Sequence, residues 1–179
     1  MHLRPETPAD HDAVRALHRA AFGDHGRTVA DLTDDLRPGI AVTGGASVVA
    51  DDDGRVIGHV MLTAAWLDAP PRLVDVLVLS PLAVHPAAQR RGTGSALVRH
   101  VLAVAQDQSI PLVLLEGDPG YYGRLGFVLA ATLGVRSPSL RIPEGALQAV
   151  PLAGHAPRMT GTLVYRDVFW RHDAVGLRA

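Results

Sequence analysis

The stretch from Leu82 to Leu97 reads LAVHPAAQRRGTGSAL, and it decides the fold. An apolar strand ends, the chain turns, and a basic loop punctuated by glycines runs directly into an amphipathic helix. A helix start carries unpaired backbone N–H groups and the positive end of the helix dipole. Gly92 and Gly94 have no Cβ, so an anion can approach this backbone closely. Arg90 and Arg91 add charge that persists at any working pH. The stretch therefore predicts a phosphate-binding loop.

The glycine spacing and the composition exclude the commoner phosphate sites and several kinds of catalysis. Leu97 stands where a dinucleotide fingerprint has its third glycine. A P-loop needs a lysine, and all 17 basic residues of this chain are arginine, which also excludes a Schiff-base lysine. The chain has no cysteine, so thiol nucleophiles and disulfides are excluded. It also lacks the Gly-x-Ser-x-Gly signature of common hydrolases.

Length and composition fit one compact domain. We expect a single domain over residues 1–179, with residues 170–179 as a loose tail, because 47% of the residues are hydrophobic. The net charge of −1 provides no field that would attract nucleic acid. No apolar run approaches the length of a membrane span, and no secretory signal is evident. These features predict a cytoplasmic protein, a monomer or homodimer, without nucleic-acid or membrane partners.

Strand and helix signals alternate along the chain, which predicts a mixed α/β fold. The pattern predicts strands at 3–4, at 47–50 and 55–67, which flank a hairpin turn at 51–54, and at 73–84, 112–116, from 127, and at 162–169. Helix signals cover 7–21, 29–36 (ended by Pro38 and Gly39), 97–105 and the short turn 119–125. Pro81 interrupts the longest Val/Leu-rich strand and has no N–H to give to a ladder. A parting of that strand from its neighbour beside the basic loop, or a plain edge strand, would each explain this proline.

Two motifs together resemble a known family. The segment QRRGTG (89–94) resembles the Gln/Arg-x-x-Gly-x-Gly/Ala motif of the GNAT superfamily of N-acetyltransferases. The segment YYGRLGF (121–127) resembles that family's second signature, and its double tyrosine is typical of a bacterial subgroup of predicted acetyltransferases. The resemblance implies one GNAT-like domain with a central, mostly antiparallel sheet of about six or seven strands, splayed near Pro81 and flanked by helices on both faces.

The resemblance also implies the co-substrate and the residues that bind it. Acetyl-CoA would be the acetyl donor, with no metal. The strand before the loop would pair with the pantetheine arm, and the N–H of Val84 would polarise the thioester carbonyl. The cofactor-binding residues implied in this way are Leu82, Ala83, Val84, Gln89, Arg90, Arg91, Gly92, Thr93, Gly94 and Ser95.

The catalytic residues are less completely matched. Tyr122 stands where the family has its general acid, although a buried tyrosine with a structural role is the alternative, and Tyr121 is expected to pack. Many members carry a Glu on the central strand, where this chain offers Asp75 and Ser80. Glu116, at the end of the next strand, is a candidate base or a paired structural acid. His59 is a second candidate base, and an ordered water is a further alternative.

One further departure and several other polar residues complete the comparison. Asp118 and the following proline stand where members often have an Asn that contacts the cofactor. His11, His18 and His25 recur every seven residues without a metal-ligand pattern, so we expect solvated histidines on a helix surface. Asp24 and His25 lie where the family shapes its acceptor pocket, and a simple loop cap is the alternative.

The sequence thus predicts an N-acetyltransferase that moves the acetyl group of acetyl-CoA directly to a primary amine of a small molecule or peptide. Two alternatives remain open at this point. One is a transferase that uses a longer acyl-CoA. The other is a non-catalytic sensor that binds acyl-CoA without turnover.

Overall fold

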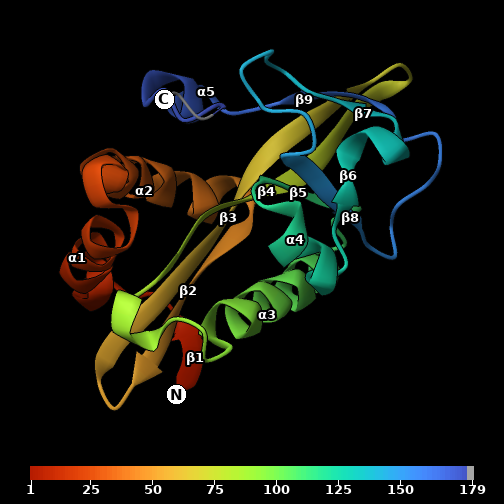
Figure 1. Cartoon of the computed structure of the whole chain (residues 1–179). Helices are drawn as coiled ribbons and strands as arrows, with labels where there is room; N and C mark the ends of the chain where they lie inside the picture. The colour runs from red at the N-terminus through yellow and green to blue at the C-terminus, as the bar shows by residue number, and fades with distance from the viewer. Residues whose placement is uncertain (177–179) are drawn as a thin grey trace. The chain divides into compact units, whose positions relative to one another are not determined.

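Figure 1 shows the computed structural model, which describes residues 1–176. The chain divides into two compact units, Met1–Thr63 with Leu79–Val104 (unit 1) and Ala64–Val78 with Ala105–Ala179 (unit 2). Each unit is described by itself below. The last three residues of the predicted tail, 177–179, lie outside the described residues, and the assignment of 1–179 to a single domain stays a prediction.

The elements alternate largely as the sequence pattern indicates. The longer helices are α1 (His11–Phe22), α2 (Gly26–Thr43) and α3 (Thr93–Asp107), and the short ones are α4 (Pro119–Tyr122) and α5 (Asp167–Arg171). The strands are β1 (His2–Pro5), β2 (Gly45–Asp52), β3 (Arg55–Ala69), β4 (Arg72–Val84), β5 (Leu112–Glu116), β6 (Val128–Leu129), β7 (Val135–Arg136), β8 (Leu147–Pro151) and β9 (Gly161–Val164).

Unit 1 contains strands in the order β1-β2-β3-β4, in which β1 pairs with β2 and β2 with β3 in antiparallel fashion. The predicted hairpin between β2 and β3 is confirmed, because its two turn residues, Asp53 and Gly54, have φ values of 52° and 83°. Two consecutive left-handed residues form the tight turn that suits twisted antiparallel strands. The Asp51 carboxylate also accepts a hydrogen bond of 2.7 Å from the Gly54 N–H. The hairpin places Asp52 and Arg55 beside each other at its tip.

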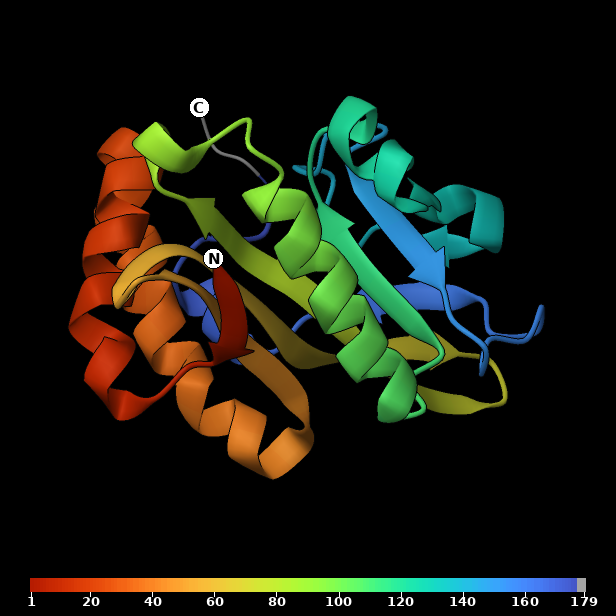
Figure 2. The same ribbon diagram turned by 90° about the horizontal axis from the view of Figure 1, so that it is seen from below.

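Helices cover both faces of this part of the sheet, with α1 and α2 on one side of β3 and α3 on the other (Figures 1 and 2). Neighbouring residues of a strand point to opposite faces. Gly58 faces α3 so closely that an added Cβ would lie 2.9 Å from Leu97 Cδ1. His59, the next residue, contacts His18 of α1 instead. The predicted flanking of the sheet by helices is thus confirmed in unit 1.

The expected end of α2 at Pro38 and Gly39 was wrong, because the helix continues through Pro38 to Thr43. A proline inside a helix forfeits only its own hydrogen bond and strains the preceding turn. Here that turn is held from outside, since the Arg37 guanidinium pairs with Glu6 at 2.8 Å and also contacts Asp34. Beyond the proline, the Thr43 hydroxyl donates to the Gly39 carbonyl at 2.8 Å. Tertiary contacts therefore override the local helix-stop signal.

Unit 2 contains strands in the order β3-β4-β5-β8-β6, with β9 on β3 and β7 on β9. Among residues 1–176 the sheet has nine strands, more than the six or seven expected, because it includes β7 and β8, where the sequence pattern predicted no strand. The predicted strand over 162–169 also ends early, at Val164, and α5 follows. There the rings of Tyr165 and Phe169 pack 5.0 Å apart, and this contact favours a turn over extended chain.

The pairing between β4 and β5 is parallel and short. It joins Leu77 to Val113 and Val78 to Leu114, and so ends three residues before Pro81. The Ser80–Pro81 peptide bond is cis. A proline has no N–H to continue a ladder, so the recorded pairing agrees with the interruption expected at this residue.

A chain of hydrogen bonds runs through the core of unit 1. His18 Nε2 lies 2.9 Å from His59 Nδ1, and His59 Nε2 lies 2.9 Å from Ser47 Oγ. The Ser47 hydroxyl donates to Glu6 Oε2 at 2.5 Å, so Ser47 Oγ must accept from His59 Nε2–H. His59 Nδ1 then accepts from His18 Nε2–H. The expectation of a solvated His18 was wrong: its side chain is 0% exposed, because it lies under the sheet face that α1 covers.

This network perturbs the pKa of each titratable member. Burial lowers the pKa of His18 to about 3, aided by His59 and Arg37. Burial also lowers the pKa of His59, against the pull of Glu6. Burial by itself would raise the pKa of Glu6, but hydrogen bonds from His59, Arg37 and Ser47 lower it to about 2. The network therefore favours neutral imidazoles at His18 and His59 and an ionised carboxylate at Glu6.

We expect the free energy of unfolding to fall by roughly 2 kcal/mol between pH 7 and pH 5 through His18. Its pKa is about 3 in the fold and 6.5 in the unfolded chain, so the unfolded chain binds more protons as the pH falls through 6.5. His59 acts in the same direction. Urea denaturation over this pH range measures the effect, with His18→Leu as the comparison. An equally steep pH dependence in the variant would contradict the assignment to His18.

No helix among residues 1–176 is long and apolar enough to cross a membrane. The same residues contain no cluster of three or more His, Cys, Asp or Glu side chains arranged to hold a metal ion.

Candidate active site

The basic loop is held to the end of β4 by its own side chains. His85 N donates to the Ile57 carbonyl of β3 at 2.9 Å, and the His85 ring accepts a hydrogen bond from Ala87 N at 3.3 Å. The Gln89 amide then reaches back and donates to the Val84 carbonyl at 3.1 Å. The first residue of the QRRGTG motif thus anchors the loop to the strand that precedes it.

The middle of the loop alternates in backbone handedness. Arg90 has φ 59° and Gly92 has φ 85°, whereas Arg91 between them is not left-handed. A left-handed conformation is uncommon and costly for a side chain such as that of Arg90. Alternation of this kind turns successive N–H groups toward one concavity, which suits an anion. The glycine at position 92 is therefore required by the backbone.

The N-terminus of α3 supplies further donors. Ala96 N donates to the Gly92 carbonyl at 2.9 Å, which is the first hydrogen bond of the helix. The N–H groups of Thr93, Gly94 and Ser95 precede this bond and so have no partner within the helix. They lie at the positive end of a 15-residue helix. We call the segment from Gln89 to Ser95 the cradle.

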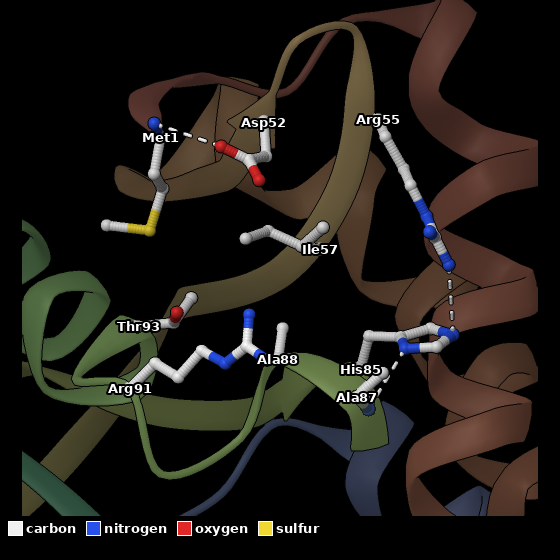
Figure 3. A pocket seen from close by; sticks show the side chains of 9 residues that line it. All are labelled: Met1, Asp52, Arg55, Ile57, His85, Ala87, Ala88, Arg91 and Thr93. Carbon is white, nitrogen blue, oxygen red and sulfur yellow. Dashed lines mark hydrogen bonds and ion pairs between the residues drawn. The ribbon is translucent and has the colours of Figure 1, made fainter.

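Positive charge without acidic partners surrounds the cradle. In the described part of the chain, neither Arg90 nor Arg91 forms an ion pair or a hydrogen bond. Among the residues that the structure describes, the Arg55 side chain at the tip of the β2–β3 hairpin has a single polar contact, of 3.5 Å from its Nη2 to His85 Nε2. Arg55, His85 and Arg91 line a cavity of about 460 Å³ between the hairpin and the cradle loop (Figure 3). Asp52 also lines this cavity, and its carboxylate pairs with the Met1 ammonium group at 3.1 Å. The chain has almost no net charge, so this local excess marks a site for an anion.

The end of β4 presents backbone donors as well. Because His85 N points to β3, the N–H of Val84, one residue earlier, points away from β3. Ala83 is 2% exposed and faces the core, while Leu82 and Val84 are half-buried. The last residues of β4 therefore have a packed side and a partly open side next to the cradle.

The second motif lies in unit 2, just after β5. Asp118 caps α4, because its carboxylate accepts a hydrogen bond of 2.9 Å from Gly120 N. This bond explains an Asp followed by Pro at a helix start. Both tyrosines follow within the same short helix. Tyr122 packs edge to face on Phe127, with ring centroids 5.6 Å apart, and on Tyr121 at 4.8 Å.

The Tyr122 hydroxyl is kept protonated by its surroundings. Burial, aided by Tyr121, raises the pKa of Tyr122 well above its usual value near 10. Within the described residues, its hydroxyl has no hydrogen-bond partner. Tyr122 is thus a neutral phenol with an unengaged proton at any working pH, as a general acid must be.

Both oxygens of the Glu116 carboxylate are engaged. Tyr165 OH donates to Oε1 at 2.7 Å, and Gly176 N donates to Oε2 at 3.0 Å. Burial raises the pKa of Glu116, while these two hydrogen bonds oppose the rise. The side chain therefore joins the end of β5 to the segment that follows α5.

The surroundings of the other candidate bases do not favour that role. His59 is 0% exposed, and both its ring nitrogens are engaged in the buried network. Asp75 is exposed on β4, far along the strand from the cradle, and Ser80 is half-buried. His11 is half-buried, whereas Asp24 and His25 are exposed in the turn between α1 and α2.

Two residues near the second motif escaped the sequence analysis. Gln148 of β8 is 1% exposed, and its amide donates to the Gly117 carbonyl at 2.9 Å. Gly117 itself lies against the Tyr122 ring. The Glu6–Arg37 pair at the end of the buried network was also missed. Of these residues, only Gly117 could have been noticed from the sequence, because a glycine stands there between the strand and the Asp-Pro helix start.

Comparison with known proteins identifies the class that this geometry defines. The family model for the acetyltransferase (GNAT) domain matches residues 2–130, well over half of the chain. The chain therefore belongs to the GNAT family of acetyltransferases, and the protein is an acyltransferase. The resemblance read from the two motifs is confirmed.

Relatives cover nearly the whole chain. The uncharacterized N-acetyltransferase YhbS of Escherichia coli (strain K12) is 33% identical over 174 residues, which are 96% of this chain and 99% of that protein. A crystal structure of YhbS from Escherichia coli in complex with CoA superposes with a TM-score of 0.82 at 31% identity, covering 95% of this chain and 92% of that chain.

A second solved structure agrees. A GNAT family acetyltransferase from Brucella melitensis, in complex with acetyl-CoA, has a TM-score of 0.74 at 28% identity and covers 94% of this chain and 97% of that chain. A weaker likeness connects 65 residues of the chain to a mycothiol acetyltransferase of Mycolicibacterium gilvum at 43% identity, over 19% of that protein. The mixed α/β fold class is therefore confirmed.

Proposed function

We propose that the protein transfers the acetyl group of acetyl-CoA directly to a primary amine of a small molecule or peptide. The observation that carries this proposal is the cradle, with its left-handed residues, its open helix N-terminus and its unpaired arginines. Two GNAT relatives of similar structure bind CoA or acetyl-CoA. A pyrophosphate is the anion that this arrangement of N–H donors and guanidinium groups suits.

The cradle and the end of β4 would bind different parts of acetyl-CoA. The N–H groups from Thr93 to Ser95, with Gln89 and the two arginines that follow it, would hold the pyrophosphate. The half-buried backbone of Leu82 to Val84 would pair with the extended pantetheine arm. A hydrogen bond from Val84 N–H to the thioester carbonyl would stabilise the negative charge that develops there during attack.

The chemical step needs a neutral amine, an electrophilic carbonyl and a proton for the leaving group. The amine nitrogen attacks the thioester carbonyl carbon, a C–N bond forms, and the C–S bond then breaks. Tyr122 would give its proton to the departing thiolate, and the nitrogen releases a proton to solvent. A phenol suits this role because it is a far weaker acid than a carboxylic acid and stays protonated until the thiolate forms.

We assign Glu116 an anchoring role in preference to that of a base. A base must be oriented toward the attacking amine, whereas the Glu116 carboxylate is held in place by Tyr165 and Gly176, which each donate a hydrogen bond to one of its oxygens. The acceptor amine would then arrive already neutral or lose its proton to water.

Replacement of Glu116 by Gln tests the two roles. We expect Glu116→Gln to lower the free energy of unfolding by about 1–3 kcal/mol, because the new amide N–H₂ faces one of the two donors. The turnover number should stay within a few-fold of wild type. Chemical denaturation and steady-state rates measure both quantities. A rate loss on the order of 10²–10⁴ with unchanged stability would instead identify Glu116 as the base.

An amine screen tests the proposed function as a whole. Purified protein is incubated with acetyl-CoA and a panel of polyamines, amino acids, aminoglycosides and peptides, and free thiol is measured over time. We expect amine-dependent thiol release with at least one member. Tight CoA binding without release by any amine would support a sensor, and release only from longer acyl-CoA thioesters would correct the donor.

A further inference from the structure

Gly117 has no backbone reason to be a glycine. It follows β5 and lies outside the left-handed region, unlike Gly126 of the same motif, whose φ is 92°. Its φ is in the range that residues with side chains adopt, so the reason for glycine lies in the space around it. A Cβ at this position would stand 2.4 Å from Tyr122 Cε2 and 2.9 Å from Tyr122 Cδ2. The Tyr122 ring therefore occupies the place that a side chain of residue 117 would take.

The peptide groups of Gly117 are held from two sides. Its N–H donates to the Ala146 carbonyl at 3.0 Å. Its carbonyl accepts a hydrogen bond of 2.9 Å from Gln148 Nε2. Gln148 lies on β8 directly opposite Leu115 and is 1% exposed, so the amide that donates to the Gly117 carbonyl is buried. An amide in such a place is costly unless it is paired, so the pairing fixes the end of β5.

The ring of Tyr122 is confined on its other side by Phe127 and Tyr121. Its hydroxyl, in contrast, has no partner among the described residues that could hold it in place. The position of the oxygen is therefore set by where the ring sits, and the ring sits against the bare Cα of Gly117.

We propose that Gly117 and Gln148 are positioning residues that place the Tyr122 hydroxyl for catalysis. Gly117 does so by leaving room for the ring, and Gln148 by fixing the Gly117 peptide. The inference rests on the proposed role of Tyr122 as general acid. It adds two residues that touch no substrate and act only through Tyr122.

Gly117→Ala is the direct test. Restoring ordinary contact would move the ring from 2.4 Å to at least 3.4 Å from the new carbon, a shift of about 1 Å. A misplacement of this size can cost about 10²-fold in rate. We expect the turnover number to fall by that factor, with little change in the KM for acetyl-CoA. Gly123→Ala is the matched control, because a Cβ there meets no atom within 4 Å and the backbone is helical.

A double-mutant cycle with Tyr122→Phe separates positioning from a general structural effect. In Tyr122→Phe the ring remains but the hydroxyl is gone, so Gly117→Ala should then lower the rate by no more than about twofold. Additive losses in the double variant would overturn the positioning role. A wild-type rate in Tyr122→Phe alone would instead refute the proposed general acid, so the two failures are distinguishable.

Gln148→Met tests the same positioning role without placing any new atom against the Tyr122 ring. It keeps the length of the side chain and removes the donor to the Gly117 carbonyl. We expect a smaller loss of turnover, on the order of tenfold, again absent in the Tyr122→Phe background. Chemical denaturation of every variant confirms folding before rates are compared. If Gly117→Ala does not fold, Gln148→Met decides the proposal: an additive loss, or a wild-type rate, overturns it.

Discussion

Replacement of Tyr122 by phenylalanine should lower the turnover number by a factor on the order of 10²–10⁴, the usual contribution of a general acid. The ring would stay packed between Phe127 and Tyr121, so the fold and the affinity for CoA should not change. The loss would come from the proton alone. Without it, a thiolate must leave unprotonated or take a proton from water. Steady-state thiol release with any competent amine measures the effect.

Tyr121→Phe is the matched control for this prediction. Tyr121 is the neighbouring residue of the same short helix, about 100° away around its axis, so the two hydroxyls point in different directions. We expect its turnover number to stay near that of wild type. A normal rate in Tyr122→Phe would assign the proton to another group or to water. Impairment of Tyr121→Phe alone would mean that the motif is read one residue out of register.

The introduction of a carboxylate at Gly94 should abolish CoA binding. Gly94 is the second residue of α3, where its N–H belongs to the open first turn. Gly94→Asp would place bulk and a negative charge against the pyrophosphate. Placing like charges together at a binding site costs several kcal/mol. This corresponds to an affinity loss of at least about 100-fold, since about 1.4 kcal/mol is tenfold. Calorimetric titration of CoA into the variant and wild type measures the loss.

Gly39→Asp controls for the substitution itself. Gly39 lies in α2, and a Cβ there meets no atom within 4 Å. The variant should bind CoA as wild type does. Aspartate near a helix N-terminus is favourable for the helix, so Gly94→Asp should also remain folded. Equal CoA affinity of Gly94→Asp and wild type would remove the basis for placing the pyrophosphate at the cradle.

Local sequence determined the elements that carry their own signals. The β2–β3 hairpin was predicted because Asp53 and Gly54 favour left-handed turns, and the limits of β5 followed from an apolar run that starts after Pro111 and ends at Glu116. The cradle was likewise readable, because its glycines, arginines and helix start are contiguous. In each case the physical cause lies within a few residues of the chain, so the pattern alone indicates the structure.

Tertiary structure decided everything that depends on partners distant in sequence. His18 has a helix-surface pattern, yet His59 and the sheet bury it, 41 residues away. Pro38 signals the end of a helix, yet α2 passes through it beside the Arg37–Glu6 pair, whose members are 31 residues apart.

The same limit applies to the candidate catalytic residues. From the sequence alone Glu116 is a candidate base, and the structure shows that Tyr165 and Gly176 hold its carboxylate by hydrogen bonds. The reason for a glycine at position 117 is likewise found only in the structure, where the Tyr122 ring fills the space beside it. Whether a buried polar group is a base, an anchor or a positioning residue depends on which atoms complete its hydrogen bonds and packing. Those atoms are supplied by the fold, and no local pattern names them.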